Sequence, residues 1–224
     1  MIKVAQCWDD GVLNDARLVE LLRKYNAKAT FNICPARHKA KERFVSHWQG
    51  CVTGGLAWNE LKTIYDGFEV ASHTMCHCNA GEVDDKVFLH QAVAAKNILE
   101  DLFEKPCRGF AWPCGMYTDE TRKLLREAGF LYGRTGKNSE NILTCEDPMI
   151  LPSNCHVLNS NFWEIFEKAK PSGVFYFWGH SYELNSEEKW QEFEQKLKRL
   201  SIDKKVEFCN VVDIVEIITR KNAE

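Results

Sequence analysis

Short apolar runs alternate with amphipathic helical segments along almost the whole chain, and this alternation limits the folds that the sequence can adopt. Strands are predicted over residues 2–8, 29–33, 68–72, 109–112, 130–134, 174–178 and 206–209. Helices are predicted over residues 15–25, 59–65, 84–103, 118–128, 161–168, 186–200 and 211–220. Strands that alternate with helices indicate an α/β fold with a parallel sheet and helices outside it. About seven strand–helix units favour a closed or nearly closed (β/α) barrel, which we expect to form a single domain over residues 1–224.

Composition and charge narrow the classes of partner. The net charge of the chain is -3 without a long basic run, which gives no reason to expect nucleic acid or an anionic membrane. No apolar stretch approaches the roughly 20 residues of a membrane span, and two acids occur too early for a secretory signal. The ten cysteines contain no Cys-x-x-Cys pair, and we interpret them as mostly buried, reduced thiols. These features predict a cytoplasmic protein.

Polar motifs follow four of the predicted strands at their C-terminal ends, where barrel enzymes carry their active sites. They are Asp9-Asp10-Gly11, His73, Pro113-Cys114-Gly115 and His180. Each motif has an ordinary explanation when it is taken alone, such as a solvated turn or a structural histidine. Four polar clusters at one edge of a sheet instead predict a functional site there.

Two of these motifs suit a metal ion. The adjacent carboxylates of Asp9 and Asp10 repel each other unless a cation or separate hydrogen bonds stabilise them. His73 and His77 would place two imidazoles on one face if residues 73–77 form a helical turn. Two histidines and one carboxylate leave a coordination position open, and a metal there lowers the pKa of water toward ~7. The motifs therefore predict a mononuclear catalytic centre in which one aspartate binds metal and its neighbour acts on water.

These residues resemble the polysaccharide deacetylases of carbohydrate esterase family four, whose core is a distorted (β/α) barrel. The first motif of that family, Thr-Phe-Asp-Asp-Gly, corresponds to Cys-Trp-Asp-Asp-Gly at residues 7–11. The second, His-Ser/Thr-x-x-His, is matched completely at residues 73–77, and a Thr-Phe pair typical of the family stands at residues 30–31. The resemblance extends from residue 3 to about residue 213.

The resemblance implies a role for each matched residue. Asp9 would be the catalytic base, and Asp10, His73 and His77 would hold one divalent metal. His180, at the end of the late strand, would be the general acid that protonates the leaving amine, a role that suits a pKa near 6.5. Zn²⁺ is the expected metal, and Co²⁺, Ni²⁺ or Mn²⁺ would also suit these ligands.

The third motif departs from the family pattern. Where the family often reads Phe-Arg-Pro-Pro-Tyr-Gly, residues 110–115 read Phe-Ala-Trp-Pro-Cys-Gly, so that Ala111 replaces the arginine that holds the catalytic aspartate. Arg108 or Arg134 could supply that charge, and Arg134 is favoured because it ends the next strand at the correct edge; a surface ion pair is its alternative role. The usual aspartate partner of His180 is not evident, although Glu183 is near in sequence.

Residues expected to face the substrate include several aromatic side chains, since sugar rings stack on aromatic faces. We expect Trp8 and Trp178 in the core, and Trp112 and Tyr182 in the groove. Cys114 replaces the tyrosine whose backbone N–H contributes to the oxyanion hole, and its own amide could do the same. The predicted substrate-binding or oxyanion residues are Trp112, Pro113, Cys114, Gly115, Arg134 and Tyr182.

The leading functional hypothesis is a metal-dependent hydrolase that removes the N-acetyl group of an amino sugar or polysaccharide. One alternative is hydrolysis of a small cyclic amide or imide, because relatives in this superfamily open such rings and the altered third motif suits a different substrate. A second alternative is a non-catalytic carbohydrate-binding relative, which the lost arginine favours. Retention of both Asp9 and His180 argues against it, because binding alone needs neither a base nor an acid.

Overall fold

The computed structural model of the chain describes residues 1–223, and one curved sheet of nine strands forms its centre. The strands of this sheet are β1 (Ile2–Asp10), β2 (Thr30–Ile33), β5 (Glu69–Ser72), β6 (Gly109–Ala111), β7 (Tyr132–Asn138), β8 (Leu151–Ser153), β9 (Cys155–His156), β10 (Val174–Gly179) and β11 (Val206–Cys209). Their order is β8-β7-β6-β5-β2-β1-β10-β9, with β11 pairing β1, and all of these pairs are parallel. The predicted α/β fold is therefore confirmed.

The two end strands of this order, β8 and β9, are separated along the chain by Asn154 alone. The Asn154 side chain donates to the Ser139 carbonyl at 2.9 Å and accepts from the Tyr176 amide in β10 at 2.7 Å. The sheet thus curves round until its ends meet at this residue, which gives the nearly closed barrel that was predicted. The strand count of about seven was too low, because β8 and β9 are too short to stand out as apolar runs.

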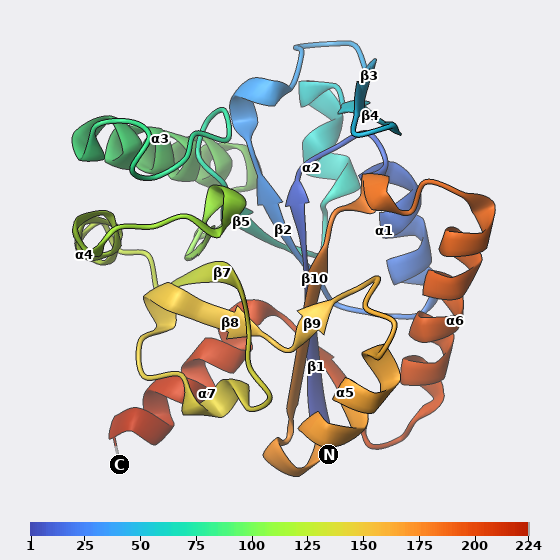
Figure 1. Cartoon of the computed structure of the whole chain (residues 1–224). Helices are drawn as coiled ribbons and strands as arrows, with labels where there is room; N and C mark the ends of the chain where they lie inside the picture. Colours follow the sequence, from blue (N-terminus) through green and yellow to red (C-terminus); the bar gives the residue numbers. More distant parts are fainter. Residues whose placement is uncertain (224) are drawn as a thin grey trace.

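Seven α-helices of the described residues accompany the sheet: α1 (Asp15–Lys24), α2 (Leu61–Ile64), α3 (Asp85–Phe103), α4 (Asp119–Glu127), α5 (Phe162–Ala169), α6 (Glu187–Ile202) and α7 (Val211–Ala223). Figure 1 shows α1, α5 and α6 on one side of the central strands and α3, α4 and α7 on the other. Each predicted helix is present within a few residues, the one predicted over residues 59–65 as α2 continued from a short 3-10 helix (Trp58–Glu60). None of the described helices combines the length and apolar character needed to cross a bilayer.

Alternation along β1 divides its side chains between two environments. Val4 and Trp8 pack in the core beneath the helices, where the Trp8 ring meets Phe193 of α6 edge-on at 5.1 Å. Cys7 belongs to the opposite cluster with Tyr176 of β10, whose hydroxyl lies 3.0 Å from the Cys7 sulfur. Asp9 follows on the Cys7 side of the strand, so the fold buries its carboxylate inside the barrel.

A separate antiparallel hairpin, β3 (Phe44–Trp48) and β4 (Cys51–Gly55), was not predicted from the sequence. It stands at the top of Figure 1, beside the ends of β1 and β2. The hairpin turns through Gln49 and Gly50, both with positive φ (47° and 79°), as a two-residue turn between right-twisted strands requires. It therefore rises from the same edge of the sheet as the predicted polar motifs.

Candidate metal centre and active site

The Asp9 carboxylate is held by side chains from two other strands. Asn32 of β2 donates its side-chain N–H to Oδ1 at 2.7 Å, and the Arg134 guanidinium from β7 contacts both carboxylate oxygens. Asp9 and Arg134 are both only 2% exposed. Burial by itself would raise the pKa of Asp9, but the charge and hydrogen bond of Arg134, together with the nearby His73 and His180, outweigh burial and hold that pKa well below its usual range. Asp9 is thus kept as a carboxylate in a buried position.

Arg134 reaches Asp9 because of the register between β6 and β7. Ala111 and Arg134 are directly paired across these two strands. Ala111 occupies the position at which the third motif usually carries an arginine, so the guanidinium comes from the neighbouring strand and the same row of the sheet. The other candidate, Arg108, is exposed at the opposite end of β6, beside a different cavity.

Asp10, His73 and His77 converge at the mouth of the barrel. Oδ1 of Asp10 lies 3.8 Å from Nε2 of His73 and 3.7 Å from Nε2 of His77. Ligands 2.0–2.1 Å from a tetrahedral ion would be about 3.4 Å apart, so these separations are only slightly wider than such an ion requires. These three side chains therefore fit a metal ion.

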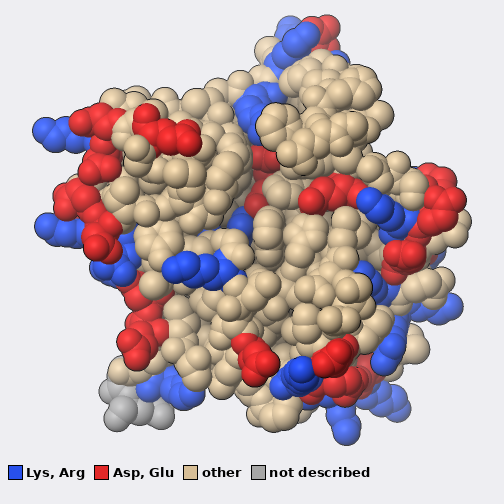
Figure 2. Space-filling model, viewed as in Figure 1, with Lys and Arg blue, Asp and Glu red and all other residues tan. Residues whose placement is uncertain are grey.

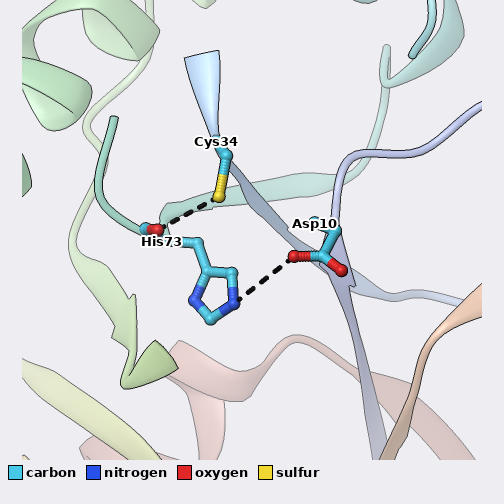
Figure 3. A group of neighbouring side chains, drawn as sticks. All are labelled: Asp10, Cys34 and His73. Carbon is cyan, nitrogen blue, oxygen red and sulfur yellow. Dashed lines mark hydrogen bonds and ion pairs between the residues drawn. The ribbon is translucent and has the colours of Figure 1, made fainter. Parts of the chain in front are cut away.

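The His73 ring is already arranged as a ligand. Its Nδ1 donates to the Ala111 carbonyl at 2.8 Å, which directs the lone pair of Nε2 toward Asp10 (Figure 3). Burial lowers the pKa of His73 to about 4, so the ring is neutral at neutral pH. A neutral imidazole is the form that binds metal.

The two histidines do not share a helical turn, and that part of the sequence prediction was wrong. Thr74 and His77 have positive φ (62° and 66°), and the segment leaves β5 as a series of turns. The Thr74 hydroxyl accepts the Cys78 amide at 3.1 Å, a bond that the Thr74 carbonyl would accept in an α-helix. The turns bring both rings to Asp10 at a centroid separation of 4.8 Å.

Two further side chains lie against these candidate ligands. Cys34 is buried at the end of β2 and donates its thiol to the His73 carbonyl at 3.1 Å (Figure 3), and burial raises the pKa of this thiol well above its usual value. Its sulfur belongs to a compact group of potential ligands with Asp10 and His73. Nη1 of Arg37 donates to Oδ1 of Asp10 at 3.0 Å, so a guanidinium shares the oxygen that faces both histidines.

His180 faces Asp9 from the end of β10, with its Nε2 3.8 Å from Oδ2 of Asp9. Its partner is Glu183, whose Oε2 accepts from the Nδ1 of His180 at 3.0 Å and from the His180 amide at 2.9 Å. His156 of β9 donates to the same oxygen at 2.9 Å. Burial lowers the pKa of His180, but the bond to Glu183 and the charges of Asp9, Asp10 and Glu183 together outweigh burial, so the net shift is upward. Glu183 occupies the place for which no aspartate was evident in the sequence.

A single cavity of about 560 Å³ joins these groups and opens to the surface. Its size lies within the usual range of ligand sites. Figure 2 shows a hollow in which acidic atoms are recessed, bordered by uncharged atoms and by a few basic ones. Tyr182 borders the cavity as expected. Trp178, expected in the core, is only partly buried and also lines the cavity, where its ring lies 4.8 Å from the Arg134 guanidinium carbon.

Trp112 was expected to offer a face to substrate, and the structure corrects this. The ring is 1% exposed, stacks on Phe88 at 5.7 Å and donates its N–H to the Met149 carbonyl at 2.8 Å. Trp112 reaches the edge of the cavity, but Phe88 already covers a face of its ring. It is therefore a core residue that supports the turn after it.

That turn is the short 3-10 helix Pro113–Gly115, in which Cys114 and Gly115 line the cavity and Pro113 is buried behind them. Cys114 has φ 53° and is exposed. The turn is closed by the Gly115 amide, which donates to the Trp112 carbonyl at 2.8 Å.

Comparison with known families agrees with these motifs. The family model described as polysaccharide deacetylase matches residues 2–133, which is more than half of the chain. This chain belongs to the polysaccharide deacetylase family. No protein of curated function matches its sequence. The matched region contains Asp9, Asp10, His73 and His77, whereas Arg134 and His180 lie beyond it.

Solved structures share the fold of this family member at low sequence identity. A polysaccharide deacetylase of Mycobacterium smegmatis aligns with 98% of this chain and 90% of its own, with a TM-score of 0.71 and 14% identity. A family 4 acetyl xylan esterase from Clostridium thermocellum, in complex with cobalt, aligns over 98% and 91%, with a TM-score of 0.58 and 17% identity. The deacetylase PplD of Streptococcus pyogenes, in complex with acetate, shares 20% identity at a TM-score of 0.51 over 59% of this chain. The chain spans only 55% of that protein's length.

Sequence reasoning missed several residues that complete the site. His156 lies 27 residues before Glu183, and only the pairing of β9 with β10 brings the two together. Asp15 is buried at the start of α1, accepts from the Ser181 hydroxyl at 2.5 Å and thereby holds the turn that carries Glu183. An isolated His or Asp carries no sequence signal of this kind, because the partner comes from a distant strand.

Proposed function

We propose that this polysaccharide deacetylase family member is a metal-dependent amidohydrolase that removes the N-acetyl group of an amino sugar. The observation that carries the proposal is the position of Asp9, with Arg134 on one side and His180 on the other, immediately beside Asp10, His73 and His77. A base and an acid beside a metal site are what amide hydrolysis requires.

The chemistry of the donor set supports a divalent ion held by Asp10, His73 and His77. Bound there, such an ion would polarise the acetyl carbonyl and make water easier to deprotonate. We propose Zn²⁺ as the default, and Co²⁺, Ni²⁺ or Mn²⁺ would also suit two imidazoles and a carboxylate. The cobalt in the Clostridium thermocellum esterase is a second reason to include Co²⁺.

Asp9 and His180 divide the proton transfers. Asp9 is kept ionised by Arg134, so it can accept a proton from the attacking water. His180 bonds to Glu183 through Nδ1 and directs Nε2 toward the cavity, where its proton passes to the leaving nitrogen as the C–N bond breaks. We assign the Cys114 amide to the acyl oxygen in the transition state, because the Cys114 turn lines the same cavity. The products are acetate and a free amino sugar.

The cellular location and the partners follow from the same features. All ten cysteines are free thiols, which supports the proposed cytoplasmic location. The proposed partner is an N-acetylated sugar that enters the cavity beside Tyr182. Arg134 acts from behind the site through Asp9, and Gly115 shapes the turn that carries Cys114.

Acetate release tests this proposal. The Zn²⁺-loaded chain should release acetate from oligomers of N-acetylglucosamine, and Asp9→Asn and His180→Ala should each lower kcat by about 100-fold or more. Glu187→Gln, an exposed carboxylate paired with Arg17, is the matched control and should retain full activity. Ring opening of a small cyclic imide without any acetate release would replace the proposed substrate by the imide class. Absence of both reactions in the metal-loaded protein would favour a non-catalytic binding protein.

A further inference from the structure

The hairpin β3–β4 places an exposed tryptophan beside the active site. Trp48 is 58% exposed, which is unusual for so large an apolar side chain. Together with Gln49 and Thr53 it lines the cavity that contains Asp9 and His180. In Figure 2 the surface above and to the right of the recessed acidic atoms is mostly uncharged.

The register of the hairpin separates its two faces. Ser46 pairs with Thr53, and Trp48 pairs with Cys51, so Trp48 and Thr53 are diagonal neighbours on one face. His47 pairs with Val52 on the opposite face. Of these two faces, only that of Trp48 and Thr53 contributes to the cavity.

The base of the hairpin is fixed to the loop that follows Asp10. The Leu13 amide donates to the Gly54 carbonyl at 3.1 Å, and the Asn14 side chain donates to the Val52 carbonyl at 3.2 Å. A side chain at Gly54 would approach the Phe44 carbonyl oxygen to 1.9 Å, so the two strands pack without space between them. The hairpin that carries Trp48 is therefore anchored at its base to the loop that follows Asp10.

Thr53 provides a second, independent indication of a ligand. It is 4% exposed and lines the cavity, yet its Oγ1 has no hydrogen-bond partner among the described residues. A buried hydroxyl without a partner costs free energy unless a ligand or water satisfies it. The Gln49 amide, at the same rim, adds a neutral donor and acceptor.

We infer that this face of the hairpin is a saccharide subsite, in which Trp48 stacks on a sugar ring next to the unit that is deacetylated. This inference rests on the proposed function and narrows its substrate to oligosaccharides of N-acetylated sugars. An aromatic face flanked by a neutral hydroxyl and a neutral amide matches a pyranose, which has apolar C–H faces and hydroxyls at its edge. A small cyclic imide bound at Asp9 and His180 would leave Trp48 without a role.

Binding and turnover of two probes test the subsite. The probes are N-acetylglucosamine and its β-1,4-linked tetramer, titrated calorimetrically into the Zn²⁺-loaded protein and assayed for acetate release. The tetramer should bind more tightly than the monomer, and Trp48→Ala should weaken tetramer binding and raise its KM by about tenfold or more. The value of kcat should change less than twofold, and Trp48→Phe should recover most of the affinity.

The matched control is Val52→Ala, which removes an apolar side chain of similar exposure (51%) from the opposite face of the same hairpin. It should leave the binding and turnover of the tetramer unchanged. Equal affinity of the Trp48→Ala variant and the wild type for the tetramer would overturn the subsite, and so would equal binding of tetramer and monomer. Binding that depends on Trp48 without any acetate release would support the subsite while contradicting the proposed deacetylation.

Discussion

Replacing Arg134 by methionine should destabilise the protein and make its stability strongly dependent on pH. The side chains of Arg134 and Asp9 are each only 3% exposed, and the guanidinium contacts both carboxylate oxygens. Removing one partner of a buried ion pair costs about 3–5 kcal/mol, because the other charge remains buried. Methionine has a similar length and fits beside Trp178, so the loss is mainly one of charge.

Protonation of Asp9 limits this cost. In the variant, the buried carboxyl group of Asp9 can instead bind a proton. Protonating it at pH 7, roughly three pH units above its unfolded pKa near 3.9, costs about 1.4 kcal/mol for each unit, or about 4 kcal/mol in total. In the wild type the folded pKa of Asp9 is lowered, so its stabilising contribution is present above the unfolded pKa and is lost as the pH falls through the folded pKa. In Arg134→Met the folded pKa is raised, so stability is lost as the pH rises above the unfolded pKa.

The measurement is thermal unfolding of metal-free wild type, Arg134→Met, Asp9→Asn and the double variant between pH 4.5 and 7.5. We expect Arg134→Met to lower Tm at pH 7 by about 6–20 °C, since about 1 kcal/mol corresponds to 2–4 °C in a chain of this size. The difference in Tm between Arg134→Met and the wild type should become smaller toward pH 4.5. Adding Asp9→Asn to Arg134→Met should recover most of the lost Tm. A Tm loss below about 2 °C, or a loss independent of pH, would refute the reasoning.

Two further variants test neighbouring contacts. Glu183→Gln removes the carboxylate that raises the pKa of His180. The alkaline limb of the pH profile of kcat/KM should therefore move to lower pH, with about a tenfold loss of activity above that limb. An alkaline limb at the same pH as in the wild type would contradict the assignment of His180 as the general acid. Arg37→Ala frees the Asp10 oxygen that faces both histidines, so Zn²⁺ affinity measured by chelator competition should rise up to about fivefold, because a half-exposed pair contributes at most about 1 kcal/mol. Arg43→Ala, which removes an ion pair with Glu60, is the control and should leave Zn²⁺ affinity unchanged.

The regular strands and helices could be predicted because periodicity records which face of each element is buried. The strand predicted over residues 2–8 continues through Asp10, where positive φ (81°) ends it. The hairpin could not be predicted in the same way, since Val45, Trp48 and Val52 are exposed and its polar and apolar residues follow no buried face. Closure of the barrel at Asn154 depends on hydrogen bonds between distant segments.

The residues of the candidate site were likewise predicted only in part. The motifs at residues 9–11 and 73–77 predicted side chains that the fold brings together, because both follow parallel strands whose ends meet. The helical turn between the histidines was wrong, since the Thr74 hydroxyl replaces a helical hydrogen bond. Arg134 was favoured because it ends the next strand at the correct edge, and the register of β6 with β7 brings its guanidinium to Asp9. The contact of Glu183 with His156 depends on the pairing of β9 with β10, which leaves no local pattern.

Metal content tests the central claim most directly. The wild-type protein, dialysed against Zn²⁺ and then against buffer, should retain one ion per chain by elemental analysis. His77→Ala should lose it, whereas His47→Ala, an exposed histidine on the outer face of the hairpin, should retain it. One ion per chain in His77→Ala, bound as tightly as in the wild type, would contradict the assignment of Asp10, His73 and His77 as the metal centre.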